Sequence, residues 1–308
     1  MKTVLIVNHF RKACGVQQFG RRVHDLIKNS TSVKYIYREM ETKEEFVSIF
    51  TEIQPDIILY NWHRGTMPWL SEELVKSIGI SKQYFIFHDE FTRQNYDKYL
   101  FFGDYDFNGG IKFGDKKVLL PRPLLKYEGN YPKNNVITIG SFGFGFWNKG
   151  YHTLTKLVND KFIDAVLNLH MPYSYFGDPL KKQTNEVEAE CRKLVTNPKL
   201  KLRITHDLLD DNGVLTFLAG NDINVFMYGE NGEGISSVID YALSVKRPIA
   251  ISNSKMFRHI SNPEIVLSDK NHLIEILERG TKPLEQYYEK WKPENFIKEM
   301  EDIFNANQ

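Results

Sequence analysis

The segment 140–150, GSFGFGFWNKG, follows a short apolar run and combines four glycines with one lysine, Lys149. Glycines let a backbone approach a phosphate group closely, and a lysine adds a positive charge to it. The segment matches neither a complete dinucleotide fingerprint nor a P-loop, because no Gly-Lys-Ser/Thr occurs in it. We interpret it as a phosphate-binding loop, the alternative being a flexible loop with a solvated lysine.

A second segment, YGENGEGISS at 228–237, places Glu230 and Glu233 among three glycines. Gly234, Ile235 and Ser236 would expose backbone amides where a helix begins, and such amides attract an anionic phosphate. A neighbouring carboxylate can accept hydrogen bonds from sugar hydroxyls. The alternative is an acidic helix start that only favours the helix dipole.

Two further loops follow apolar runs in the first half of the chain. Gly15 and Val16 would open a helix after the run 3–7, with free N–H groups that can meet an anion. The alternative there is a plain strand-to-helix turn. His88 and Asp89 follow the apolar run 84–87, and a histidine there can bind a polar substrate or move a proton. The alternative is a histidine that serves local structure.

No metal or cofactor is expected. The nine histidines are scattered without an HxxxH pair, and two cysteines, Cys14 and Cys191, cannot make a four-ligand zinc site. Asp104-Tyr105-Asp106 is a D-x-D of the kind that can hold a divalent ion against a nucleotide diphosphate. The motif is short and common by chance. A metal-dependent reaction that uses Asp104 and Asp106 is therefore kept only as the last of three hypotheses about function.

Strand-like and helix-like runs alternate along the whole chain, which is typical of α/β architecture. Strands are expected at 3–7, 33–37, 57–60, 84–87, 136–139, 165–169, 200–204, 223–227 and 248–251, and helices at 16–28, 43–53, 70–78, 151–158, 186–195, 211–219, 236–244 and most of 284–305, broken near Pro293. The proline-containing run 117–132 suits an extended segment between two domains. Ligands of parallel sheets bind beyond the carboxyl ends of the strands, where the four loops lie.

The composition limits the class of protein. The chain has 308 residues, 42% of them hydrophobic and 26% charged, which excludes a disordered or fibrous chain. Its 40 basic and 39 acidic residues give a formal charge of +1, so nucleic acid is not an expected partner. No apolar run approaches a signal peptide or a membrane span. A cytoplasmic protein is expected, with a peripheral contact to the inner membrane surface through Arg21, Arg22 and Lys28 if these form a basic face rather than a merely solvated one.

Together these loops resemble those of the GT-B glycosyltransferases, in particular the large retaining group called family 4. The strongest match is the stretch 207–252, in which GENGEGISSVIDYA resembles the family's E-G-F-G-x-P-x-x-E-A. Ala242 and Pro248 set the alignment, which places Glu233 on the family's first glutamate. Gly15, His88-Asp89, Lys149-Gly150 and the C-terminal YEKWKPENFIKEMEDIF add to it.

The resemblance implies two Rossmann-like doubly wound parallel-sheet domains that face a cleft: an acceptor-side domain at 1–130, a nucleotide-sugar domain at 131–285, and a helix at 286–308 that crosses back to the first. It implies a retaining, metal-independent transfer of a hexose from a nucleotide-diphosphate sugar, with UDP-sugar favoured. The acceptor stays open, a glycan or lipid-linked glycan being favoured, as in polysaccharide biosynthesis.

The implied roles follow residue by residue. The Gly15 and Val16 amides would approach the donor diphosphate, and Lys149 would neutralise it as it leaves. Glu233 would bind hydroxyls of the donor sugar, while Gly234, Ile235 and Ser236 offer amides to the phosphate. His88 would lie by the reacting sugar, with Asp89 supporting its loop.

The sequence departs from the family at two positions. The family's phosphate-binding arginine falls near Ser141, and its second glutamate falls on Tyr241, with Asp240 one position away. The second hypothesis is therefore a non-catalytic glycan- or nucleotide-binding protein on a degenerate fold of this type.

Overall fold

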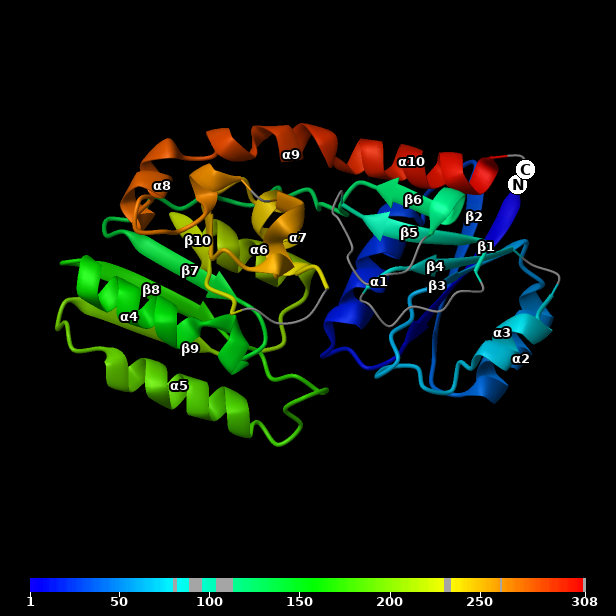
Figure 1. Ribbon diagram of the computed structural model, residues 1–308, viewed down its shortest axis with the longest axis horizontal. Helices are drawn as coiled ribbons and strands as arrows, with labels where there is room; N and C mark the ends of the chain where they lie inside the picture. Colours follow the sequence, from blue (N-terminus) through cyan, green and yellow to red (C-terminus); the bar gives the residue numbers. More distant parts are fainter. Residues whose placement is uncertain (80–81, 89–95, 104–112, 230–233, 261, 307–308) are drawn as a thin grey trace. The chain divides into compact units, whose positions relative to one another are not determined.

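The computed structural model describes residues 1–79, 82–88, 96–103, 113–229, 234–260 and 262–306. The chain divides into two compact units, Met1–Pro123 with Lys290–Gln308 (unit 1) and Leu124–Glu289 (unit 2). Each unit has one sheet whose paired strands all run parallel within the described ranges (Figure 1). The expected pair of parallel-sheet α/β domains is confirmed.

Unit 1 is built on a six-stranded sheet of order β2-β1-β3-β4-β5-β6. Its strands are β1 (Lys2–His9), β2 (Val33–Met40), β3 (Ile57–Tyr60), β4 (Lys82–Ile86), β5 (Lys98–Phe102) and β6 (Lys117–Leu120). Its helices are α1 (Gly15–Ile27), α2 (Lys43–Ile53), α3 (Glu72–Ser77), the short 3₁₀ helix η1 (Gly114–Lys116) and the C-terminal α10 (Pro293–Asn305).

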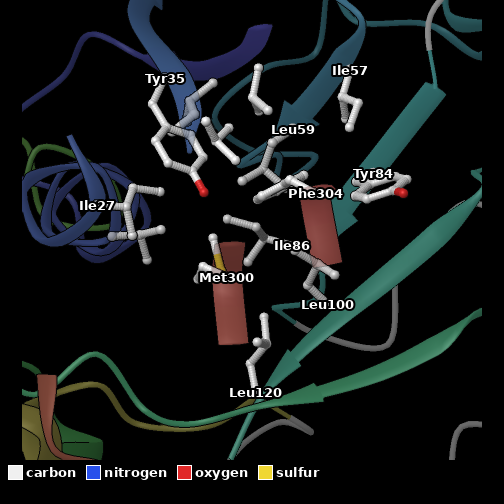
Figure 2. Close-up of a cluster of buried hydrophobic side chains, with 14 of the residues drawn as sticks. Ile27, Tyr35, Ile57, Leu59, Tyr84, Ile86, Leu100, Leu120, Met300 and Phe304 are labelled. Atoms are coloured by element: carbon white, nitrogen blue, oxygen red, sulfur yellow. The ribbon is translucent and has the colours of Figure 1, made fainter. Parts of the chain in front are cut away.

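The C-terminal helix α10 packs into the core of unit 1. Phe296, Met300 and Phe304 are spaced four residues apart, so they share one helix face, and all three are buried. Figure 2 shows Met300 and Phe304 among Ile86, Leu100 and other side chains of the sheet. The ring of Phe304 stacks on that of Tyr84 with centroids 5.5 Å apart. Burial of these aromatic side chains joins the end of the chain to the sheet that its beginning forms.

Unit 2 is built on a five-stranded sheet of order β11-β10-β7-β8-β9. Its strands are β7 (Thr138–Phe142), β8 (Ala165–His170), β9 (Leu200–Thr205), β10 (Ile223–Phe226) and β11 (Ile249–Ile251). Its helices are α4 (Tyr151–Lys161), α5 (Lys182–Leu194), α6 (Asp211–Ala219), α7 (Val238–Ser244), α8 (Leu273–Arg279) and α9 (Glu285–Lys290), with the 3₁₀ helices η2 (Trp147–Lys149), η3 (Lys255–Ile260), η4 (Pro263–Ile265) and η5 (Lys282–Leu284).

Sequence patterns missed two strands of unit 1 and one helix of unit 2. β5 was not predicted, and β6 was expected to be part of the extended segment 117–132. The backbone of Lys117–Leu120 instead pairs in register with β5, from Tyr99↔Lys117 to Phe102↔Leu120. A strand of four residues at a sheet edge has too short a pattern to be told from an extended linker. α8, of seven residues, is similarly short.

In the described ranges, no helix is long and apolar enough to span a membrane.

Candidate functional site

In unit 2, three loops at the carboxyl ends of adjacent strands are hydrogen-bonded to one another. The Gly229 amide, after β10, donates to the carbonyl oxygen of Asn148, after β7, at 2.8 Å. The hydroxyls of Ser252 and Ser254, after β11, donate to the carbonyl oxygens of Tyr228 (2.7 Å) and Gly229 (3.1 Å). Because β11, β10 and β7 are neighbours in the sheet, residues far apart in sequence meet at one edge.

Lys149 lies within this group of loops. Its Nζ is 3.8 Å from the centroid of the Tyr228 ring, and its amide donates to the Phe146 carbonyl oxygen at 3.0 Å. An ammonium over an aromatic face is held by the ring's quadrupole without being neutralised. The structure therefore brings Lys149 against the first residue of the predicted 228–237 loop.

Gly150 fixes the backbone next to Lys149. Its φ is +67°, and a Cβ built on it would lie 1.9 Å from the Met227 carbonyl oxygen. Glycine alone meets both conditions, a left-handed backbone and close contact with another main chain. The position of Lys149 over Tyr228 thus depends on a residue without a side chain.

The start of α7 differs from the prediction. The helix begins at Val238, two residues later than expected, so Gly234, Ile235 and Ser236 lie before it. The Ser236 amide donates to the Met256 carbonyl oxygen at 3.0 Å, so this amide is already engaged. The Gly234 carbonyl oxygen accepts from Arg258 Nη1 at 3.2 Å. The Ser236 amide could therefore contact a phosphate only after leaving the Met256 carbonyl oxygen, and the contacts of the Gly234 and Ile235 amides stay a prediction.

Asp240 and Tyr241 are both buried in α7. The Tyr241 hydroxyl donates to Asp211 Oδ1 at 2.6 Å, and its ring meets Phe142 edge to face with centroids 5.9 Å apart. The hydroxyl of Tyr241 therefore joins α7 to the first residue of α6.

In unit 1, α1 begins at Gly15 as predicted. Its N-cap residue, Cys14, makes no side-chain hydrogen bond to the helix, and its first turn has no acidic residue. A Cβ built on Gly15 would meet nothing within 4 Å. The space that a side chain at position 15 would enter is therefore open, and the contact of the Gly15 and Val16 N–H groups with an anion stays a prediction.

His88 lies two residues beyond β4 and is half-buried. Its Nε2 is 2.7 Å from Asn61 Oδ1, and its ring meets the Phe19 ring edge to face with centroids 5.5 Å apart. The ring is thus held from two sides at the same sheet edge as the start of α1. Asp89 and Glu233, predicted beside these loops, lie outside the described residues.

No protein-family model matches this sequence, and none of the curated proteins matches it significantly. The structure is similar to that of HepE from Anabaena in complex with UDP-glucose, with a TM-score of 0.72, 9% identity and 100% of both chains covered. It is also similar to a glycosyltransferase from Rickettsia africae (TM-score 0.62, 14% identity, 98% of this chain and 96% of that one). The lipopolysaccharide outer core galactosyltransferase WaaB matches with a TM-score of 0.61 and 12% identity over 99% of each chain.

This chain has the GT-B fold. Identities this low show a shared architecture and do not by themselves show a shared activity.

Sequence reasoning missed two asparagines of the GT-B chain's first unit. Asn8 lies near the end of β1, Asn61 directly follows β3, and both are fully buried. A polar residue at the carboxyl end of an apolar strand is a pattern that could have found them, since His88 was found in this way.

Of the three residues expected on a basic helix face, Arg21, Arg22 and Lys28, the structure buries Arg22. Arg22 is only 1% exposed, with its guanidinium 5.5 Å from the Phe19 ring centroid. Lys28 pairs with Asp25 at 2.9 Å. The prediction was wrong for Arg22 because α1 is covered on the side from which that side chain extends.

Within the ranges that the structure describes, no group of three or more His, Cys, Asp or Glu side chains could hold a metal ion. Asp104 and Asp106 lie outside those ranges.

Proposed function

We propose that this protein is a glycosyltransferase that moves a hexose from a nucleotide-diphosphate sugar, with UDP-sugar favoured, to a glycan or lipid-linked glycan acceptor. The observation that carries the proposal is the position of Lys149, whose Nζ lies over Tyr228 where the loops after β7, β10 and β11 join. The GT-B fold shared with HepE, which was crystallised with UDP-glucose, supports a nucleotide-sugar donor.

The proposed reaction breaks the bond between the sugar carbon and the diphosphate oxygen, and forms a bond to an acceptor hydroxyl oxygen on the same face of the sugar. The O–H bond of the acceptor breaks, and its proton passes to the departing diphosphate. Negative charge grows on the departing diphosphate and positive character on the sugar carbon. The Lys149 ammonium would stabilise the diphosphate, as would the amides of Gly15 and Val16. A cation and helix amides can do this without a metal ion, so a metal-independent reaction is proposed. Its retaining course is proposed from the resemblance to family 4.

The carboxylate of Glu233 would accept hydrogen bonds from the donor sugar's hydroxyls. His88 would lie beside the reacting sugar, with Asp89 supporting its loop. In this arrangement unit 2 binds the nucleotide sugar and unit 1 presents the acceptor.

A non-catalytic glycan- or nucleotide-binding protein is the second candidate. It is favoured by the side chains at 141 and 241, where Ser141 is buried and the Tyr241 hydroxyl is bonded to Asp211. Neither supplies the cation or the carboxylate that the resembling family has there.

Nucleoside diphosphate release from a panel of UDP-, GDP-, ADP- and dTDP-sugars, with and without EDTA, tests the proposal. We expect release from one donor, most strongly a UDP-sugar, at a rate that EDTA leaves unchanged. Loss of release in EDTA would instead favour a metal-dependent reaction. Binding of a donor without turnover, even with glycan acceptors added, would favour the second candidate. If no donor released a nucleoside diphosphate and none raised the Tm of the protein, both hypotheses that assume a donor site would be contradicted.

Gly15 offers a test of the predicted diphosphate contact that is separable from folding. Gly15→Ala should keep the Tm of the wild type, because nothing lies within 4 Å of the added Cβ. The Tm of Gly15→Leu, whose side chain extends past that Cβ, is measured first as the folding control. The leucine would fill the space beside the first amides of α1, so we expect it to weaken UDP binding about tenfold, a cost of about 1.4 kcal/mol. Isothermal titration with UDP measures the effect. Unchanged affinity in Gly15→Leu would place the diphosphate elsewhere.

A further inference from the structure

We propose that Asn8 and Asn61 are positioning residues that hold the neutral His88 ring with its proton on Nε2, so that Nδ1 is the nitrogen with the lone pair. The inference rests on the proposed function for the role of His88, but its geometry and its first test are independent of catalysis. Asn8, Asn61 and His88 lie at the ends of β1, β3 and β4, which are neighbours in the sheet.

The orientation of the Asn8 amide is set by main-chain groups. Its Nδ2 donates to the Gln17 carbonyl oxygen at 2.9 Å, and its Oδ1 accepts from the His9 amide at 2.9 Å. A carbonyl can only accept and a backbone N–H can only donate, so the reversed amide would lose both bonds. Oδ1 of Asn8 is therefore fixed as an acceptor.

The orientation of Asn61 follows from that of Asn8. Its Nδ2 donates to Asn8 Oδ1 at 2.8 Å and to the Val16 carbonyl oxygen at 2.7 Å. Both partners only accept, so both Nδ2 protons are used and the amide cannot be reversed. The Oδ1 of Asn61 is left as the atom that meets His88.

The contact between Asn61 and His88 then has one direction. Asn61 Oδ1 carries only lone pairs, and His88 Nε2 lies 2.7 Å from it, so Nε2 must donate. In the neutral imidazole the other nitrogen, Nδ1, is unprotonated. The edge-to-face contact with Phe19 limits rotation of the ring away from this bond.

The space for the asparagine pair is provided by α1. A Cβ built on Gly20 would lie 2.3 Å from Asn61 Nδ2 and 2.8 Å from Asn8 Nδ2. The hydrogen bonds continue beyond Asn8 on the side away from His88. Asn8 Nδ2 donates to the Tyr37 hydroxyl (2.8 Å), which in turn donates to Glu39 Oε1 (2.9 Å). Each donor is polarised by the acceptor beyond it, which strengthens the bonds as a series.

The proposed tautomer determines which kind of substrate atom His88 Nδ1 can bind. A neutral ring with its lone pair on Nδ1 accepts a hydrogen bond from a hydroxyl group there. It does not donate one to a phosphate oxygen from that nitrogen. In the proposed reaction, a sugar or acceptor hydroxyl can therefore donate to Nδ1, whereas a phosphate oxygen cannot accept from it.

Long-range ¹H–¹⁵N correlation spectra of protein labelled at histidine nitrogens test the tautomer directly. The His88 resonances are assigned by their loss in His88→Gln, at a pH at which the ring is neutral. We expect a protonated Nε2 and an unprotonated Nδ1 in the wild type. A protonated Nδ1, or an averaged mixture of the two forms, would overturn the proposal. Once His88→Gln has given the assignment, the wild-type spectrum decides this even if the asparagine variants fail to fold.

Asn61→Leu removes the acceptor and should give a mixture of both His88 tautomers. Asn221→Leu is the matched control, because Asn221 is an equally buried asparagine that donates to Asn224 Oδ1 (2.9 Å) and the Phe217 carbonyl oxygen (3.1 Å) within unit 2. It should leave the His88 spectrum unchanged. If Asn221→Leu shifted the tautomer as Asn61→Leu does, the effect would be general destabilisation and the assignment to Asn61 would fall.

Asn61→Asp supplies a second readout. It keeps an acceptor oxygen but adds a negative charge, which favours the imidazolium, so the pKa of His88 should rise by about one unit or more. An unchanged pKa would show that position 61 does not face the ring.

Turnover separates the two proposals. With an active donor, Asn61→Leu should lower kcat/KM by up to about 10²-fold through loss of ring position. A wild-type Nε2–H tautomer together with no turnover on any donor would contradict the proposed transferase and leave the tautomer assignment standing.

Discussion

Lys149→Ala is expected to lower donor turnover by about 10²–10³-fold, because it removes a positive charge from the position proposed for the departing diphosphate. Lys149 Nζ lies over the Tyr228 ring at 3.8 Å, and an aromatic face holds the ammonium without cancelling its charge. The loss should appear mainly in kcat, since the charge to be stabilised grows as the bond to the sugar breaks. Initial rates of nucleoside diphosphate release measure it.

Lys156→Ala is the matched control. Lys156 is an exposed lysine of the adjacent helix α4 and pairs with Asp160 at 2.9 Å, so its removal should change both stability and turnover little. Equal rates of diphosphate release for Lys149→Ala and the wild type would show that Lys149 does not act in the reaction. The position of Lys149 would then no longer support the proposed function. An equal loss in both variants would indicate a general effect of charge instead.

Gly150→Ala is expected to destabilise unit 2 by about 3 kcal/mol, from backbone strain of about 1–2 kcal/mol and overpacking of about 1–3 kcal/mol. The Cβ would lie 1.9 Å from the Met227 carbonyl oxygen, a main-chain atom that cannot turn away as a side chain can. The backbone must shift, and Lys149 and the end of β10 shift with it. We therefore expect a Tm lowered by about 10 °C and a turnover loss that approaches that of Lys149→Ala.

Gly114→Ala separates the two causes. Gly114 also has a positive φ, of +55°, but its added Cβ would meet nothing within 4 Å. Gly114→Ala should therefore lower the free energy of unfolding only by the backbone strain, about 1–2 kcal/mol. Thermal unfolding of the two variants gives the comparison, and equal destabilisation would mean that the contact with Met227 costs nothing.

Much of the fold was predictable because the patterns of apolar residues typical of strands and of helices can be recognised within short stretches of sequence. The runs 3–7, 57–60 and 223–227 are short and apolar, and each is a strand of a parallel sheet in the structure. Pro293 was expected to interrupt the last helix, and it stands at the first position of α10, where a missing N–H costs nothing. β6 was missed because only its pairing with β5 distinguishes it from a linker.

The candidate site was predictable at the level of loops. Because a sequence shows which loops follow strands, it could indicate Gly15, His88 and Lys149, which lie at the sheet edges in the structure. It could not show that Lys149 rests on Tyr228, since that contact needs β7 and β10 to be neighbours while β8 and β9 separate them along the chain.

The sequence by itself determined the α/β alternation, the two parallel sheets and the loops in which chemistry is expected, because each depends on residues close together in the chain. Only the tertiary structure decided that Arg22 is buried, that Tyr241 is bonded to Asp211, and that hydrogen bonds join Asn8 to Asn61 and Asn61 to His88. These outcomes depend on which strands become neighbours and on which hydrogen-bonding groups they bring face to face. Local periodicity carries neither kind of information.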